Sequence, residues 1–203
     1  MQILYAIFLI VSLWLPNPIV ETKAILFYGD SITAGYGIGT DLAFPNLIED
    51  QLKNNGYDVE VINGGLSGET SAGGVTRIDW MLNRKYDIFV LELGANDGLR
   101  GLPIPETKKN LEEIISRVKK KYPETKIVIA GMMVPPNMGP EYSKEFEGVF
   151  EEIASHTGAS LIPFLLKDVG GIEQLNQPDG IHPNAEGHRI IADNLYPIIL
   201  NLL

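Results

Sequence analysis

Five short apolar segments alternate with segments of helical periodicity along most of this 203-residue chain. The apolar segments are nearly unbroken in Val, Ile and Leu, which is typical of strands buried on both faces of a parallel sheet. The predicted strands are 24–28, 58–62, 87–92, 126–131 and 159–162. The predicted helices are 44–55, 73–83, 107–122, 143–157 and 184–203. This alternation predicts a doubly wound α/β domain over residues 24–203, with right-handed crossovers.

A polar, glycine-bearing block follows each of the first three predicted strands. The blocks are Gly29-Asp30-Ser31-Ile32, Asn63 to Thr70, and Gly94 to Gly98. Each block alone is consistent with ordinary turn chemistry, and Asn96-Asp97-Gly98 is typical of a type I turn. In open parallel sheets, however, ligands bind beyond the carboxyl ends of the strands. We therefore expect Ser31, Gly68 and Asn96 to meet at one edge of the sheet.

A fourth block, Asp179-Gly180-Ile181-His182-Pro183, lies near the C-terminus. A serine hydroxyl is a weak nucleophile that needs an adjacent base, and His182 is the natural candidate for this role. Asp179 lies three residues earlier, close enough in a tight turn to orient the imidazole. The alternative is a structural turn in which Asp179 caps the final helix.

These four blocks together resemble the SGNH hydrolases, or GDSL family, which are named for a Ser, a Gly, an Asn and a His. The stretch from Glu92 to Gly101 is similar to the thioesterase I/lysophospholipase branch of bacterial enzymes, also described as arylesterases. The resemblance covers residues 24–203. It implies a three-layer, flavodoxin-like fold whose five-stranded parallel sheet has the strand order 2-1-3-4-5.

The same resemblance implies an esterase or thioesterase that cleaves a small acyl ester or thioester through an acyl-enzyme, without metal or cofactor. The implied catalytic triad is Ser31, Asp179 and His182. The implied oxyanion hole consists of the Ser31 N–H, the Gly68 N–H and the Asn96 side-chain amide. Two alternatives remain open. One is a polysaccharide O-deacetylase with the same triad, and the other is a non-catalytic flavodoxin-like binding module.

Composition excludes several other classes of function. The formal net charge of −10 argues against nucleic acid as a partner, because phosphate binding requires a basic surface. The chain has no cysteine, and its three histidines are too scattered for a metal cluster. His188 is expected to be a surface or partly buried residue of the last helix. Nothing in the sequence indicates an oligomeric state.

The segment after the fourth predicted strand combines apolar side chains with Pro and Gly at the same edge of the sheet. We expect Val134, Pro135 and Met138 to bind substrate, because soft apolar side chains suit an acyl groove. Core packing is an equally good interpretation for the neighbouring Met132 and Met133.

The N-terminus predicts export. Residues 3–15 are almost wholly apolar and are followed by Pro16. This run is shorter than the about 20 residues needed to span a bilayer and matches the apolar core of a signal peptide. Residues 1–23 are thus expected to form a leader that sends the protein to the periplasm or the exterior. Because no Lys or Arg precedes the run and no Ala-x-Ala site follows it, the alternative is an uncleaved membrane anchor.

Overall fold

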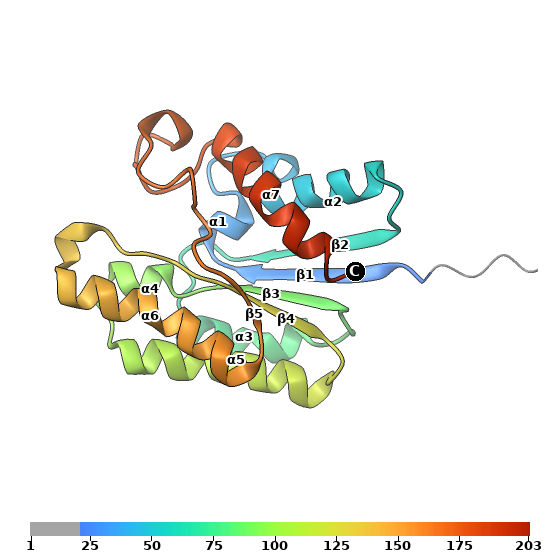
Figure 1. Ribbon diagram of the computed structural model, residues 1–203, viewed down its shortest axis with the longest axis horizontal. Helices are drawn as coiled ribbons and strands as arrows, with labels where there is room; N and C mark the ends of the chain where they lie inside the picture. The colour runs from blue at the N-terminus through green and yellow to red at the C-terminus, as the bar shows by residue number, and fades with distance from the viewer. Residues whose placement is uncertain (1–20) are drawn as a thin grey trace, which may run out of the picture.

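The computed structural model describes residues 21–203 of the chain. These residues are organised around a single parallel sheet. Its five strands run in the order β2-β1-β3-β4-β5 (Figure 1). The strands are β1 (Lys23–Gly29), β2 (Val59–Gly65), β3 (Ile88–Glu92), β4 (Lys126–Ala130) and β5 (Ser160–Ile162). All neighbouring pairs are parallel. The predicted fold class and strand order are confirmed.

Helices cover both faces of this sheet. The α-helices are α1 (Ser31–Ala34), α2 (Phe44–Asn54), α3 (Ser71–Met81), α4 (Ala95–Leu99), α5 (Ile104–Lys121), α6 (Pro140–Thr157) and α7 (Ala185–Leu200). Short 3₁₀ helices are η1 (Thr40–Leu42), η2 (Pro136–Met138) and η3 (Glu173–Leu175). Helices α1, α2 and α7 lie on one face, and α3, α4, α5 and α6 lie on the other (Figure 1). The result is the three-layer arrangement expected of alternating strands and helices.

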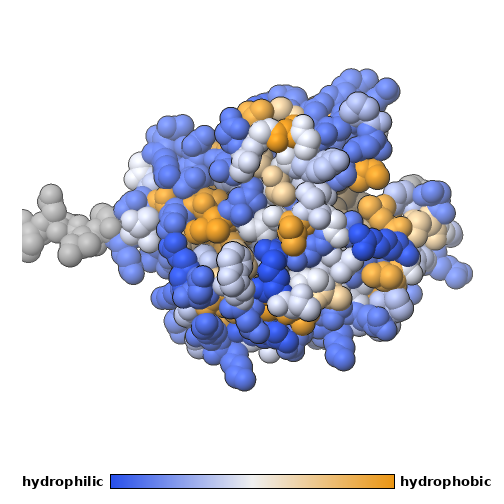
Figure 2. Space-filling view, turned by 180° about the vertical axis from the view of Figure 1, so that it is seen from behind, coloured by the Kyte–Doolittle hydropathy of each residue, from blue (hydrophilic) through white to orange (hydrophobic). Residues whose placement is uncertain are grey.

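The core sits around the interior strands of the sheet and is most completely buried at β1 and β3. Residues 25–28 and 88–91 are fully buried, because helices cover these strands on both sides. This explains why the two strands are apolar without alternation. The outer surface is mixed, and the face shown in Figure 2 carries scattered apolar side chains among hydrophilic ones.

Two predicted turns are incorrect in detail. Strand β2 continues through Asn63 and Gly64 to Gly65, where a loop was expected. The Asn63 amide explains the extension, since it donates to the Thr33 carbonyl and its Oδ1 accepts from the Gly65 N–H. The predicted type I turn at residues 96–98 is instead part of the short helix α4, which begins after Gly94 turns the chain with φ of 112°.

The prediction of an exposed or partly buried His188 is wrong, because its side chain is almost completely buried. Its Nδ1 accepts a hydrogen bond of 3.2 Å from the Phe44 N–H at the start of α2. The residue before that helix, Ala43, has no side-chain acceptor of its own. A histidine from α7 therefore caps α2, and burial lowers the pKa of His188 to about 4.

Most of the predicted leader lies outside the described residues. The described chain starts at residue 21, and β1 begins at Lys23, one residue before the predicted start of the domain. The Lys23 N–H donates to the Asp58 carbonyl and joins this end of β1 to the start of β2. Among residues 21–203, no helix is both long enough and apolar enough to cross a membrane.

Candidate active site

Ser31 lies at the point where β1 ends and α1 begins. It is the first residue of this one-turn helix, and the preceding Asp30 caps it by accepting the Ile32 N–H at 3.0 Å. The turn places Ser31 at the carboxyl edge of the sheet, with its side chain largely but not wholly covered. Positive φ at Gly35 then ends the helix, which leaves room for the loop that follows.

His182 and Asp179 approach Ser31 from the loop between η3 and α7. The His182 Nε2 lies 2.9 Å from the Ser31 Oγ, and the His182 Nδ1 lies 2.7 Å from the Asp179 Oδ2. The Asp179 Oδ1 also accepts the backbone N–H groups of Ile181 and His182. Hydrogen bonds from the His182 backbone and ring, and then from Ile181, lower the pKa of Asp179 to about 2. Asp179 does not cap α7, since Asn184 does so by accepting the Gly187 N–H.

Two side chains that sequence reasoning missed hold His182 in place. The Tyr36 ring packs on the His182 ring with 4.7 Å between their centroids. The Gln177 Nε2 donates to the Tyr36 carbonyl at 2.6 Å and to the Pro183 carbonyl at 3.0 Å. Gln177 thus joins the loop after Ser31 to the loop that carries His182. Neither residue belongs to one of the four blocks, so the sequence offered no motif that marks them.

Asn96 contacts the turn that carries Ser31, and Gly68 precedes Glu69, which Asn96 also contacts. The Asn96 Nδ2 donates to the Asp30 Oδ2 at 3.0 Å and to the Glu69 carbonyl at 3.1 Å. Gly68 adopts φ of 79°, and its carbonyl accepts from Arg100 at 3.1 Å. The structure therefore brings the third block into direct contact with the first two, whereas Ser31 contacts the fourth.

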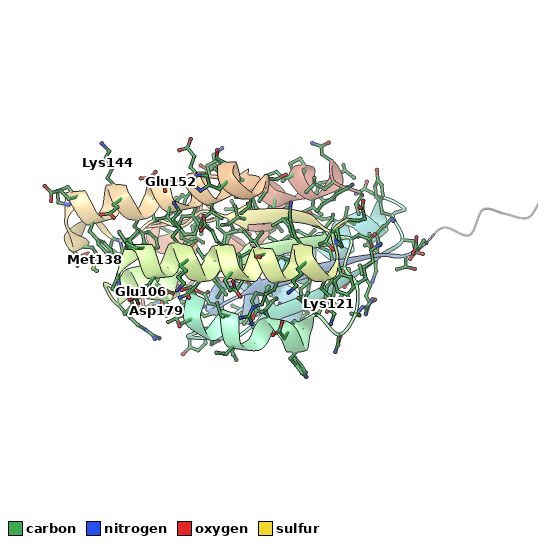
Figure 3. All side chains as sticks on the ribbon, turned by 90° about the horizontal axis from the view of Figure 1, so that it is seen from below. Glu106, Lys121, Met138, Lys144, Glu152 and Asp179 are labelled. Carbon is green, nitrogen blue, oxygen red and sulfur yellow. The ribbon has the colours of Figure 1, made fainter. Side chains whose placement is uncertain are left out.

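An apolar cavity of about 460 Å³ adjoins these residues. It is lined by Ile32, Ala95, Leu99, Met132, Met133, Val134, Pro135, Phe164, Leu166, Gly170, Gly171, Asn176, Gly180 and Ile181. Three of these, Ile32, Ala95 and Ile181, are chain neighbours of Ser31, Asn96 and His182. Val134 and Pro135 line the cavity, and Met138 lies outside this lining. Figure 3 shows Met138 and Asp179 toward the same end of the molecule, away from Lys121.

A serine hydroxyl bonded to a histidine that is itself bonded to an aspartate, at the carboxyl edge of a parallel sheet, is the architecture of a serine hydrolase. Comparison with known proteins agrees with this class. The model of the GDSL-like lipase/acylhydrolase family matches residues 27–190.

Relatives with known names cover most of the chain. It is 36% identical to esterase TesA of Pseudomonas aeruginosa, over 89% of this chain and 90% of that protein. It is 34% identical to thioesterase 1/protease 1/lysophospholipase L1 of Escherichia coli K12, over 83% of this chain and 79% of that protein. The crystal structure of the psychrotrophic esterase EstA from Pseudoalteromonas, inhibited by monoethylphosphonate, superposes with a TM-score of 0.83 at 34% identity, covering 88% of this chain and 97% of that one.

The chain belongs to the GDSL-like lipase/acylhydrolase family. It is an enzyme that hydrolyses esters or thioesters, as the named relatives are. Membership of this family of enzymes excludes the alternative of a non-catalytic binding module.

Proposed function

We propose that Ser31 is the nucleophile of this hydrolase, His182 its general base and Asp179 the group that orients the base. The observation that supports this assignment is the unbroken chain of hydrogen bonds from the Ser31 Oγ through both ring nitrogens of His182 to the Asp179 Oδ2. Asp179, with a pKa of about 2, remains a carboxylate across the physiological range. It therefore keeps the proton of the neutral imidazole on Nδ1 and leaves Nε2 free to accept a proton from serine.

The reaction proceeds in two balanced halves. The Ser31 Oγ attacks the substrate carbonyl carbon while its proton passes to the His182 Nε2. The resulting tetrahedral intermediate then expels the alcohol or thiol, which takes the proton from His182, and an ester to Ser31 remains. Water repeats the sequence: it gives its proton to His182, attacks the acyl carbon and releases the acid, and the proton returns to Ser31.

We propose that three donors stabilise the oxyanion of both tetrahedral intermediates: the Ser31 N–H, the Gly68 N–H and the Asn96 Nδ2. The Asn96 amide donates two hydrogen bonds, one to Asp30 and one to the Glu69 carbonyl. The bond to the carboxylate of Asp30 is the stronger one, because its acceptor is charged. The oxyanion therefore replaces the neutral Glu69 carbonyl as the second acceptor.

The apolar cavity is the proposed site for the acyl chain, with Val134 and Pro135 among its contacts. Phe164 is the one aromatic residue of its lining, whereas a polysaccharide deacetylase is expected to offer several aromatic platforms for sugar rings. Each methylene buried there contributes about 0.8 kcal/mol, so kcat/KM should rise about fourfold per added methylene until the cavity is full. A series of p-nitrophenyl esters of increasing chain length, set beside acyl thioesters, measures this dependence.

Covalent labelling tests the assignment of the nucleophile. A phosphonate ester should react at the Ser31 Oγ, and its adduct should be absent from Ser31→Ala. Ser67→Ala is the matched control, because Ser67 is an exposed serine of the neighbouring loop and should leave labelling unchanged. Labelling that persists in Ser31→Ala would refute the proposed nucleophile.

We also propose that residues 1–23 direct export. The support is the apolar run of residues 3–15 together with the start of β1 at Lys23. A chain that starts at Glu21 should retain full kcat on a water-soluble ester but remain in the cytoplasm. N-terminal sequencing of the exported protein distinguishes a cleaved leader from an anchor at the membrane. Loss of activity in the shortened chain would contradict the proposal.

A further inference from the structure

Glu92 is a carboxyl group in an otherwise apolar environment. It ends β3, after Ile88-Phe89-Val90-Leu91, and it is fully buried. Strands β1 and β3 are neighbours in the sheet (Figure 1), and Glu92 lies opposite Gly29 in their register. Its Oε2 accepts the Thr33 hydroxyl at 2.7 Å and the Asp30 N–H at 3.1 Å. Glu92 therefore contacts the turn on both sides of Ser31, without belonging to the Ser–His–Asp chain.

Gly29 permits this approach. A Cβ at Gly29 would overlap both the Glu92 Oε2 and the Thr33 Oγ1. The glycine that precedes Asp30 and Ser31 is thus required for the Glu92 carboxyl to pass beneath the turn. Its role here is a close contact, since Gly29 does not adopt a positive φ.

A second buried carboxyl links Glu92 to the oxyanion site. Both carboxylate oxygens of Asp30 accept hydrogen bonds. Its Oδ1 accepts the Ile32 N–H, and its Oδ2 accepts the Asn96 Nδ2–H at 3.0 Å. Its own N–H is the group that donates to Glu92. The order of contacts is therefore Glu92, Asp30, Asn96, and each step is a hydrogen bond between buried or partly buried groups.

The surroundings of Glu92 favour its neutral form. Neither of its hydrogen-bond donors is a cation, and its Oε1 has no partner among residues 21–203. Burial strongly disfavours a carboxylate that has no cation beside it, and a neighbouring carboxylate adds repulsion. Burial first, and then the charge of Asp30, raise the pKa of Glu92 well above its ordinary value.

Asp30 keeps its charge more easily. Burial raises the pKa of Asp30 to about 6, while hydrogen bonds from Ile32, Asn96 and Glu92 and the charge of His182 act in the opposite direction. The titratable groups around it are thus Glu92 from β3 and His182 from the loop before α7. Of the two carboxyl groups, Glu92 is therefore the one whose surroundings disfavour the charged form more strongly.

We propose that Glu92 is a positioning residue of this hydrolase, which acts as a neutral carboxylic acid that fixes Asp30 as the carboxylate acceptor of the Asn96 amide. This inference rests on the role proposed above for Asn96. Glu92 touches neither substrate nor reacting atoms, and it acts only through Asp30. Its effect is expected on kcat, because the orientation of Asn96 matters when charge develops on the substrate oxygen.

Infrared spectroscopy tests the protonation state directly. At a pH of about 8, above the pKa of Asp30, the wild type should show the carbonyl band of a protonated carboxylic acid. This band should vanish in Glu92→Gln and persist in Glu60→Gln, which removes an exposed carboxylate paired with Arg84. Absence of the band in the wild type, or its persistence in Glu92→Gln, would overturn the inference.

Kinetics test the positioning role. Glu92→Gln replaces one neutral group by another of the same shape, so kcat should stay within about threefold of wild type. Glu92→Leu removes the acceptor of the Asp30 N–H, and kcat should fall about 10-fold with little change in KM. In the background of Asn96→Ala, the same Leu substitution should cost less than about twofold, because its target is already gone.

An equal loss of kcat in Glu92→Gln and Glu92→Leu would show that a charge at residue 92 is needed. Losses of kcat that simply add in the double variant with Asn96→Ala would show that Glu92 does not act through Asn96. Either result overturns the inference. The proposed function fails on a different result, namely full activity or phosphonate labelling in Ser31→Ala. The Gln variant keeps the shape of the side chain, so the infrared test does not depend on folding of the Leu variant.

Discussion

Replacing Asn96 by Ala tests how the site stabilises the oxyanion. Removal of one oxyanion donor costs about 2.7–4 kcal/mol, or 10²–10³ in kcat. In the structure, the Asn96 amide donates to the Glu69 carbonyl, so the intermediate gains only the difference between an anionic and a neutral acceptor. We therefore expect the lower end of that range, about a 10²-fold loss in kcat, with KM within about twofold of wild type.

The assay is steady-state hydrolysis of a water-soluble p-nitrophenyl ester, with thermal unfolding measured on the same samples. Asn110→Ala is the matched control, because its amide donates to the Ser71 Oγ outside the site. It should leave kcat close to wild type. The reasoning is refuted if Asn96→Ala changes only KM, or if both variants lose activity in proportion to their loss of stability.

Five further variants test the rest of the account. Ser31→Ala should lower kcat by on the order of 10³-fold or more while the melting temperature stays near wild type; a loss below tenfold contradicts this. Asp179→Asn should lower kcat by on the order of 10²-fold, measured on the same ester, since the ring loses its orienting carboxylate; wild-type kcat would refute it. Burial lowers the pKa of His188 from 6.5 to about 4, so between these pH values the unfolded chain binds a proton at His188 that the folded chain does not. The free energy of unfolding therefore falls by up to about 3 kcal/mol as the pH drops from 6.5 to 4. His188→Gln should remove that part of the pH dependence in denaturant titrations, and an unchanged slope contradicts the assignment. Met133→Phe should shift the chain-length profile toward shorter esters, whereas Met138→Phe, outside the cavity lining, should not; equal profiles would return Met133 to a purely structural role.

The fold class can be predicted from the sequence because the apolar interior strands are compatible with few arrangements. The unbroken apolar residues of β1 and β3 can be buried only between two helical layers, so the segment pattern alone predicts the doubly wound class. Strand order came from the family resemblance, since periodicity carries no information about which strands are neighbours. The end of β2 was missed because Asn63 and Gly64 are turn residues by local preference, and a side-chain bond to Thr33 overrides that preference.

Site residues that stand in short sequence motifs could be predicted from the sequence. Site residues that act through contacts between distant parts of the chain could not. Ser31, Asp179, His182 and Asn96 stand in motifs that point to acyl transfer. Gln177 bonds to the Tyr36 carbonyl 141 positions away, which no local pattern encodes. His188 was misjudged for the same reason, because the amide that it caps belongs to α2. Glu92 did leave a signal, because it is the one carboxylate at the end of an otherwise apolar strand.

Trapping of the acyl-enzyme tests the central claim most directly. Wild type should be mixed with a p-nitrophenyl ester, quenched in acid within one turnover and analysed by intact-mass and peptide mass spectrometry. The account predicts a mass increase of one acyl group, on the peptide that contains Ser31, and no increase in Ser31→Ala. Turnover of the ester with no covalent adduct at any time, or an adduct on another residue, would contradict it.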